Sequence, residues 1–171
     1  MVRGLLPHGP VRGALGHRQC AVVQQAESGG EVTTTHGDSE AGYRFGPSEV
    51  DAVLRARPEK RYAYFVKRVA DWEEVWGLRN ADGWVMSATD AGQQVAPFWP
   101  FRAFAERAAV GSWSNTWPER IALHAFLDRW LPGLAGDGRR VCVLPDEHGQ
   151  GATVAPATLK ADIEDEREKI E

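Results

Sequence analysis

The acidic side chains near the middle of the chain are the residues best suited to catalysis. Asp71, Glu73 and Glu74 surround Trp72 within a short stretch of sequence. Two carboxylates can work as a general acid and a general base when a cleft shifts their pKa values apart. This cluster supports one hypothesis for the protein, an enzyme with a dispersed acid–base site near Asp71–Glu74.

Other patterns that carry chemistry are missing from the sequence. The five histidines and two cysteines lack the spacing that brings ligands to one metal ion. The stretch 111–114 lacks the G-x-S-x-G form of a nucleophile elbow. A phosphate-binding loop follows a strand, whereas the glycine-rich stretch 133–138 follows a helical pattern. We therefore assign no catalytic residue from these patterns, and we predict no metal ligand and no cofactor.

One predicted helix carries a basic strip that can bind a partner. Its apolar stripe contains Phe65 and Val69. Five basic side chains are assigned to the side opposite that stripe: Arg57, Lys60, Arg61, Lys67 and Arg68. Tyr64 lies among them, so charge and stacking are both available to an acidic partner or a nucleic-acid backbone. Arg61, Tyr64 and Arg68 are candidate binding residues, although a solvated charged face explains the same pattern.

The tryptophans offer a second candidate binding surface. All seven fall between positions 72 and 130. Tryptophan is enriched at interfaces because it combines a large apolar surface with an N–H donor. Trp113 and Trp117 belong to a stretch in which we predict a loop, and Asn115 lies between them. These three residues are candidates for recognition, and packing in a tryptophan-rich core is the alternative.

The composition excludes several classes of protein. Hydrophobic residues make up 43% and charged residues 26% of the chain, which is the balance of a globular protein. The net charge of −4 provides no general attraction to nucleic acid or to an anionic membrane, which argues against a nucleic-acid partner. No apolar stretch is long enough to span a membrane or to act as a secretory signal. We expect a cytoplasmic protein.

The hydrophobic pattern after residue 46 alternates between helices and hairpins. The predicted helices span 48–70 (restarting at Pro58), 100–110, 124–131 and 157–170. The predicted hairpins span 75–99 and 140–155. Pro97 cannot donate to a neighbouring strand, so its strand should lie at an edge or end there. Pro132 should end the helix at 124–131. Hairpins interrupted by helices imply an α+β fold with a mostly antiparallel sheet of about five strands.

Residues 1–46 differ from the rest of the chain. They are rich in glycine, proline, serine and threonine and poor in aromatic residues. Such a segment buries too little apolar surface to offset its ordering entropy. We interpret it as a disordered tail or as the result of a start codon assigned too far upstream, and its arginines leave a transit peptide as a third interpretation. The remaining residues, 47–171, then form a single α+β domain.

Short aromatic strings recur along this predicted domain. Among them are Arg61-Tyr62-Ala63-Tyr64-Phe65, Val75-Trp76-Gly77-Leu78, Pro97-Phe98-Trp99-Pro100 and Trp130-Leu131-Pro132-Gly133-Leu134. Their types and order resemble a bacterial family catalogued as domain of unknown function 2750, over about residues 47–171. Because that family has no established activity, the resemblance carries over no catalytic or binding residue.

Two functions therefore follow from the sequence. The first is a small non-enzymatic cytosolic module that recognises another macromolecule, with a protein as the expected partner. The second is the enzyme with an acid–base site near Asp71–Glu74. An exposed patch at Trp113 and Trp117, or at Arg61 and Tyr64, would favour the first. A deep pocket that holds a carboxylate would favour the second.

Overall fold

The computed structural model of the protein describes residues 22–23 and 46–170. Within them the α-helices are α1 (Pro47–Leu54), α2 (Pro58–Trp72), α3 (Arg102–Ala108), α4 (Leu123–Ala125), α5 (Leu131–Gly136) and α6 (Pro156–Glu168). The strands are β1 (Val22–Val23), β2 (Glu74–Asn80), β3 (Gly83–Val85), β4 (Ser87–Ala88), β5 (Gln94–Phe98), β6 (Trp117–Ala122), β7 (Arg140–Val143) and β8 (Ala152–Val154). A 3-10 turn, η1 (Gly111–Trp113), precedes β6, and a π-helical segment, η2 (Phe126–Trp130), joins α4 to α5. The predicted α+β class is confirmed.

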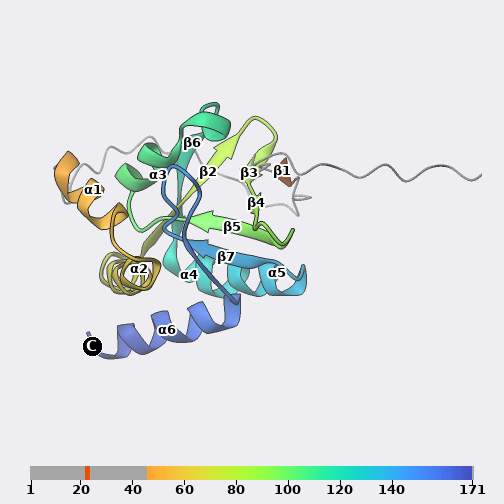
Figure 1. Ribbon diagram of the computed structural model, residues 1–171. Coiled ribbons are helices and arrows are strands. Elements are labelled where there is room, and N and C mark those ends of the chain that lie inside the picture. The colour runs from red at the N-terminus through yellow and green to blue at the C-terminus, as the bar shows by residue number, and fades with distance from the viewer. Residues whose placement is uncertain (1–21, 24–45, 171) are drawn as a thin grey trace, which may run out of the picture.

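The described strands form two sheets that are connected to one another (Figure 1). The first has the order β1-β3-β2-β6 and the second the order β4-β5-β7-β8. β3 and β4 are consecutive in the chain, and Trp76 of β2 pairs with Trp99, which follows β5. All strand pairs are antiparallel except β5 and β7, which are parallel. A parallel pair needs a long crossover, and here the crossover carries α3, β6 and the helix that ends with α5.

Pro97 lies in an inner strand, so the expectation of an edge strand is wrong, although β5 does end at Phe98. β5 lies between β4 and β7. On the β4 side, β5 pairs only through Gln94 and Val95, and the next pairing on that side is made by Trp99, whose N–H donates to Trp76. Alternate residues of a strand direct their N–H groups to the same side. Pro97 therefore lies between two pairings, at a position where no strand that the structure describes requires its missing N–H.

Two further elements differ from the sequence prediction. The predicted loop at 111–117 leads directly into β6, which pairs with β2 along its whole length. Its pattern was inconspicuous because β6 is an edge strand in which only Ile121 is buried. Pro132 does not end its helix, because helical structure continues from residue 123 to residue 136. The wider π-helical turn before Pro132 accommodates a ring that has no N–H to donate.

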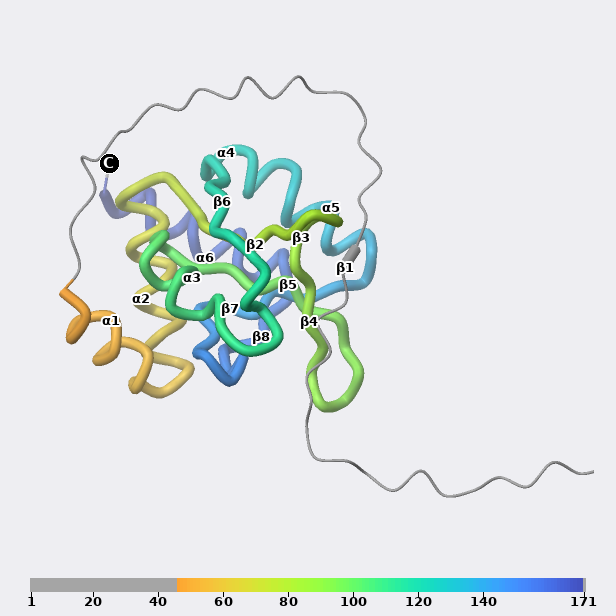
Figure 2. The backbone as a smooth tube through the Cα atoms, turned by 90° about the horizontal axis from the view of Figure 1, so that it is seen from above, coloured from red at the N-terminus to blue at the C-terminus, as the bar shows by residue number. Residues whose placement is uncertain are grey.

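The helices cover the strands in layers. α2 and α5 both contact β7, and α6 packs against these two helices on their outer side (Figure 1). Leu159 and Ile163 of α6 are fully buried in this layer. Viewed from above, α1 lies at one end of the molecule and the β4–β5 loop at the other (Figure 2). α1, α2 and α3 are therefore grouped at one end of the sheets.

The predicted tail at 1–46 lies almost entirely outside the described residues. Val22–Val23 form β1, in which Val22 is opposite Val85 and Val23 is opposite Trp84 of β3. The interpretations of the tail as disordered or as a misassigned start, and the domain boundary at 47, stay predictions. In the part of the chain that the structure describes, no helix has both the length and the apolar character needed to cross a membrane.

Candidate functional site

A polar pocket lies among α1, α2, α3 and the loop between β7 and β8. Its volume is about 470 Å³, which is large enough for a small ligand or a side chain of a partner. Two apolar residues at the α1–α2 turn contribute to its wall. Its other lining residues are ionisable: Asp51, Arg55, Arg61, Arg107, Asp146, Glu147 and His148. The consecutive helices α1 and α2, together with α3 and the β7–β8 loop, thus collect charges of both signs around one cavity.

Arg61 is the buried residue of the polar pocket, with 3% of its surface exposed. Its Nη1 donates a 3.1 Å hydrogen bond to the carbonyl oxygen of Leu144 and lies 3.7 Å from Oδ2 of Asp146. Leu144 has a φ of 47°, in the left-handed region, where the chain leaves β7. Nε of Arg61 has no hydrogen-bond acceptor among the described residues. The guanidinium therefore ties α2 to the β7–β8 loop without filling all of its donor positions.

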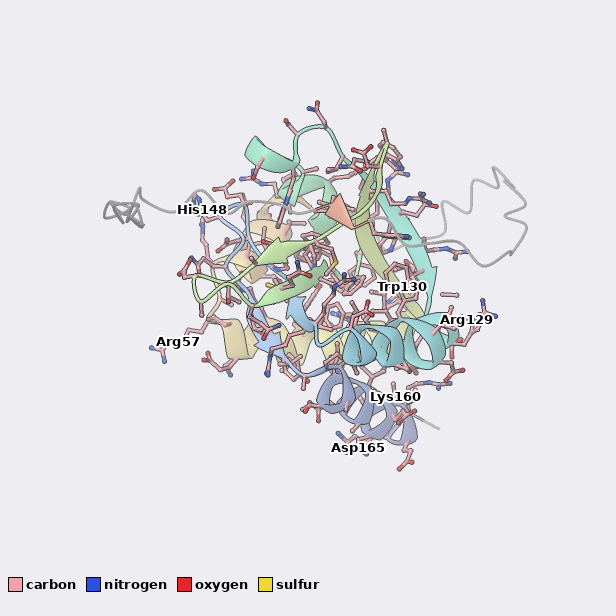
Figure 3. The ribbon with its side chains drawn as sticks, turned by 90° about the vertical axis from the view of Figure 1, so that its right-hand side faces the viewer. Arg57, Arg129, Trp130, His148, Lys160 and Asp165 are labelled. Carbon is pink, nitrogen blue, oxygen red and sulfur yellow. The ribbon has the colours of Figure 1, made fainter. Side chains whose placement is uncertain are left out.

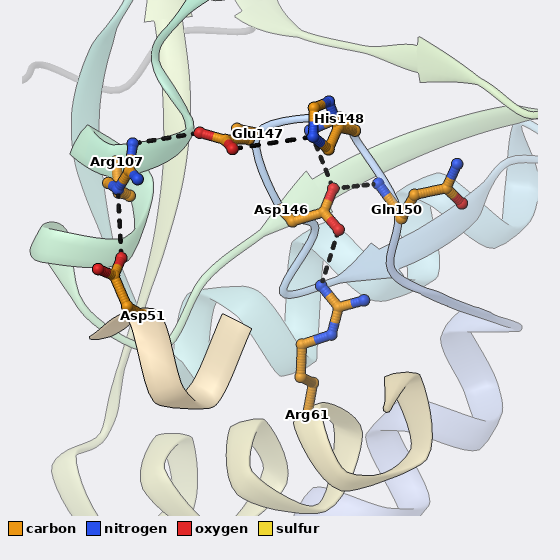
Figure 4. Close-up of polar contacts among 7 residues, drawn as sticks. All are labelled: Asp51, Arg61, Arg107, Asp146, Glu147, His148 and Gln150. Atoms are coloured by element: carbon orange, nitrogen blue, oxygen red, sulfur yellow. Dashed lines mark hydrogen bonds and ion pairs between the residues drawn. The ribbon is translucent and has the colours of Figure 1, made fainter. Parts of the chain in front are cut away.

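The β7–β8 loop presents Glu147 and His148 at the rim of the pocket (Figure 4). Oδ1 of Asp146 accepts hydrogen bonds from the backbone N–H groups of His148, at 2.9 Å, and Gln150, at 2.8 Å. The loop also packs closely on β7, since a Cβ atom at Gly151 would lie 2.7 Å from a backbone oxygen. These contacts fix the backbone that carries the two rim side chains.

Arg107 forms ion pairs across the rim of the pocket, whereas Arg55 has no ion-pair partner among the described residues. Nε of Arg107 lies 3.5 Å from Oδ1 of Asp51, and its Nη1 lies 3.2 Å from Oε2 of Glu147 (Figure 4). Arg55 is exposed and forms no ion pair with any residue that the structure describes. Exposed ion pairs stabilise a protein by about 1 kcal/mol or less. The rim pairs can therefore be exchanged for contacts with a ligand at small cost.

The prediction that Arg61 belongs to an exposed basic strip is wrong. Arg61 precedes Phe65 by one helical turn and Val69 by two, and residues at this spacing share a helix face. Phe65 and Val69 are fully buried, so Arg61 lies on the buried side of α2. Its long apolar stem allows the guanidinium to reach the pocket from that side.

The other two candidates on α2, Tyr64 and Arg68, form a contact of their own. Tyr64 is half-buried and packs edge-on against Phe104, with 5.9 Å between the ring centroids. The guanidinium of Arg68 lies 5.2 Å from the centroid of the Tyr64 ring and 3.9 Å from Asp71. This cation–π contact lies outside the polar pocket. A binding role for Tyr64 and Arg68 stays a prediction.

The two candidate tryptophans have different environments. Trp113 is 6% exposed and packs edge-on against Trp99, with 5.9 Å between the ring centroids. It belongs to the core, which was the alternative to recognition. Trp117 is 47% exposed at the first position of β6, and Asn115 is exposed in the preceding turn. The structure therefore does not place the three candidates on one surface, and a binding role for Asn115 and Trp117 stays a prediction.

The acids that follow α2 have separate partners. Asp71 pairs within its own helix, Glu73 lies 3.3 Å from Arg167 of α6, and Glu74 lies 3.6 Å from Arg120 of β6. None of the three acids lines the polar pocket. Within the described residues, no group of three side chains of the metal-binding types converges on one point. The enzyme hypothesis at this position stays a prediction.

Sequence reasoning identified only Arg61 among the ionisable residues of the polar pocket, and for a different surface. Asp51, Arg55 and Arg107 have the pattern of solvated helix positions, so nothing in their spacing distinguishes them. One signal was available in the loop, where Asp146 is followed by Gly149. Aspartate at the first position of a turn accepts hydrogen bonds from backbone N–H groups, and glycine readily adopts the positive φ with which such a turn ends.

Comparison with known proteins identifies the family of the chain. The model of a family described as "Protein of unknown function (DUF2750)" matches residues 62–163, which is more than half of the chain. This match confirms the family resemblance seen in the sequence. It includes Arg107 and the β7–β8 loop, whereas Arg55 and Arg61 precede it. No curated protein and no solved structure matches the chain significantly. The chain belongs to the DUF2750 family of proteins of unknown function.

Proposed function

We propose that the protein is a small cytoplasmic module that binds another protein without catalysing a reaction, and that the polar pocket is its recognition site. The observation that carries this proposal is the convergence of seven ionisable side chains from four segments on one cavity. Charges placed around a binding site steer the encounter with a partner and exclude partners of the wrong charge pattern. A fixed set of charges of both signs is therefore suited to selecting one protein surface among many.

The pairing of the pocket's acids favours binding over catalysis. Asp146 contacts Arg61 and two backbone N–H groups, while Asp51 and Glu147 share Arg107. A general acid or base must be within hydrogen-bond reach of the substrate proton, in a site from which water is excluded. Here each acid already has a partner, and the rim residues Glu147 and His148 are exposed. These conditions suit the exchange of one ion pair for another.

The charges of the pocket also favour a protein over a nucleic acid. Three carboxylates line the cavity, and the whole chain has a net charge of −4. A nucleic-acid backbone would bring successive phosphates toward these carboxylates, with repulsion at each step. A protein segment can place one charge in the pocket and present neutral or opposite charges around it.

Photo-cross-linking from two positions tests the proposal. Benzoylphenylalanine is introduced into the full chain at position 148, whose histidine side chain is 78% exposed, or at the exposed position 129 as a control. These positions lie on opposite sides of the view in Figure 3. After irradiation in the source cells, we expect a cross-linked protein from position 148 that is absent from position 129. The proposal fails if position 148 yields no adduct, or only the adducts that position 129 yields.

A further inference from the structure

Arg55 provides the polar pocket with a cation that can bind an anionic group of a partner. It is exposed near the end of α1 and lines the pocket, and no described residue forms an ion pair with it. A guanidinium presents parallel N–H donors that match the two oxygens of a carboxylate. An arginine in a pocket wall that has no ion-pair partner among the described residues is therefore suited to bidentate binding of such a group.

Arg61 adds a second guanidinium whose charge is only partly compensated. The carboxylate oxygen of Asp146 is 3.7 Å from its Nη1, which exceeds the usual hydrogen-bond limit of about 3.2 Å. The side chain is 3% exposed, and its Nε has no acceptor among the described residues. Because the effective dielectric constant falls with burial, an incompletely paired charge here attracts an anion more strongly than an exposed charge does.

We infer that Arg55 and Arg61 together bind a carboxylate on an acidic segment of the partner protein, an inference that rests on the proposed function. A carboxylate carries a single negative charge, whereas a phosphate monoester approaches two at neutral pH. Three carboxylates and three arginines line the pocket, so these charges leave no net positive charge that would favour the more highly charged group. The singly charged carboxylate of an aspartate or glutamate side chain is the better match.

Two short peptides of equal length, with blocked ends, provide the probes for this inference. Glutamate alternates with glycine in one, and glutamine replaces every glutamate in the other. Each peptide is titrated into the isotope-labelled full chain, and backbone and arginine side-chain N–H signals are followed by NMR. We expect the glutamate peptide to shift signals of Arg55, Arg61 and the β7–β8 loop in a saturable way, and the glutamine peptide to leave them unchanged.

A matched pair of charge-removing variants locates the binding. Arg55→Gln removes the exposed guanidinium of the pocket, and we expect it to raise the dissociation constant for the glutamate peptide about tenfold or more. Arg129→Gln makes the same change on an exposed helical position far from the pocket and should leave the constant unaltered. Equal weakening by both variants, or equal shifts with both peptides, would overturn the inference.

Two further outcomes separate this inference from the proposed function. A protein cross-linked from position 148, combined with no pocket response to the glutamate peptide, would refute the carboxylate ligand and leave the proposed function standing. Failure of both experiments would refute both. Acetate that shifts the pocket signals as strongly as the peptide, at equal carboxylate concentration, would indicate a site for free small carboxylates and overturn the assignment to a protein segment.

Discussion

Replacing Trp113 by alanine should strongly destabilise the fold, because this side chain belongs to the core. Trp113 is 6% exposed and packs against the fully buried Trp99. Removing a buried tryptophan typically costs about 3–5 kcal/mol of unfolding free energy, including about 1 kcal/mol for an aromatic pair. The unfolding free energy of a small domain falls by about 2 kcal/mol for each molar increase in urea, so the urea concentration at the unfolding midpoint should fall by about 2 M. Far-UV circular dichroism during urea titration of the full chain measures this shift without relying on tryptophan emission.

Two related substitutions serve as controls. Trp117→Ala changes the same residue type four positions later, where the residue is 47% exposed, and should cost about 1 kcal/mol or less. Trp113→Phe keeps most of the buried area and removes an indole N–H that has no acceptor among the described residues. It should therefore cost less than half as much as Trp113→Ala. Equal midpoints for Trp113→Ala and Trp117→Ala would refute the placement of Trp113 in the core.

Three other substitutions test separate contacts. Gly77→Ala would place its Cβ 2.8 Å from a ring carbon of Trp84. We expect thermal unfolding to show a loss of about 1–3 kcal/mol of unfolding free energy. An unchanged melting temperature would contradict this close approach. The Tyr62 hydroxyl donates to Asp162, and burial first, then this hydrogen bond, raises the pKa of Tyr62 above its ordinary value. The Tyr62 hydroxyl therefore ionises at a lower pH in the unfolded chain than in the folded one. Its contribution to stability is complete below about pH 10 and is lost as the pH rises further. The unfolding free energy of Tyr62→Phe should therefore fall less at alkaline pH than that of the wild type. Arg61→Met removes the hydrogen-bond donor to Leu144 and should lower the unfolding free energy by about 1–3 kcal/mol. It should also make the β7–β8 loop more susceptible to proteolysis. An unchanged cleavage rate would argue against the anchoring role of Arg61.

Local periodicity predicted the elements whose burial is one-sided. The apolar spacing of Phe65, Val66 and Val69 indicated α2, and all three residues are buried. The hairpin between β2 and β3 was predicted from the residues of its turn. In that turn Oδ1 of Asn80 accepts hydrogen bonds from the backbone N–H groups of Asp82 and Gly83. These features depend on neighbours within a few positions, so a single sequence contains the information for them.

The parallel pairing of β5 with β7 could not be predicted in the same way. The paired residues Val95 and Arg140 are separated by a long crossover, and no local pattern specifies which strands meet across it. The continuation of the helix through Pro132 was also missed, because a widened helical turn has no sequence signature as strong as proline.

Most residues of the polar pocket could not be predicted from the sequence, for a related reason. Arg55 directly follows α1 and Arg107 lies in α3, both at exposed positions where arginine is common, and only the tertiary fold brings them to one cavity. Arg61 could have been placed correctly, since its spacing from Phe65 and Val69 puts it on the buried face of α2. A buried arginine in a helix is a more specific indication of a site than a row of exposed ones.

The most direct test of the central claim, that the polar pocket is the recognition site, is the affinity of the full chain for the protein cross-linked from position 148. Isothermal titration compares the wild type with Arg55→Gln and with the control Arg129→Gln. We predict a dissociation constant about tenfold higher for Arg55→Gln and an unchanged constant for Arg129→Gln. An unchanged constant for Arg55→Gln, or an equal loss for both variants, would contradict the claim.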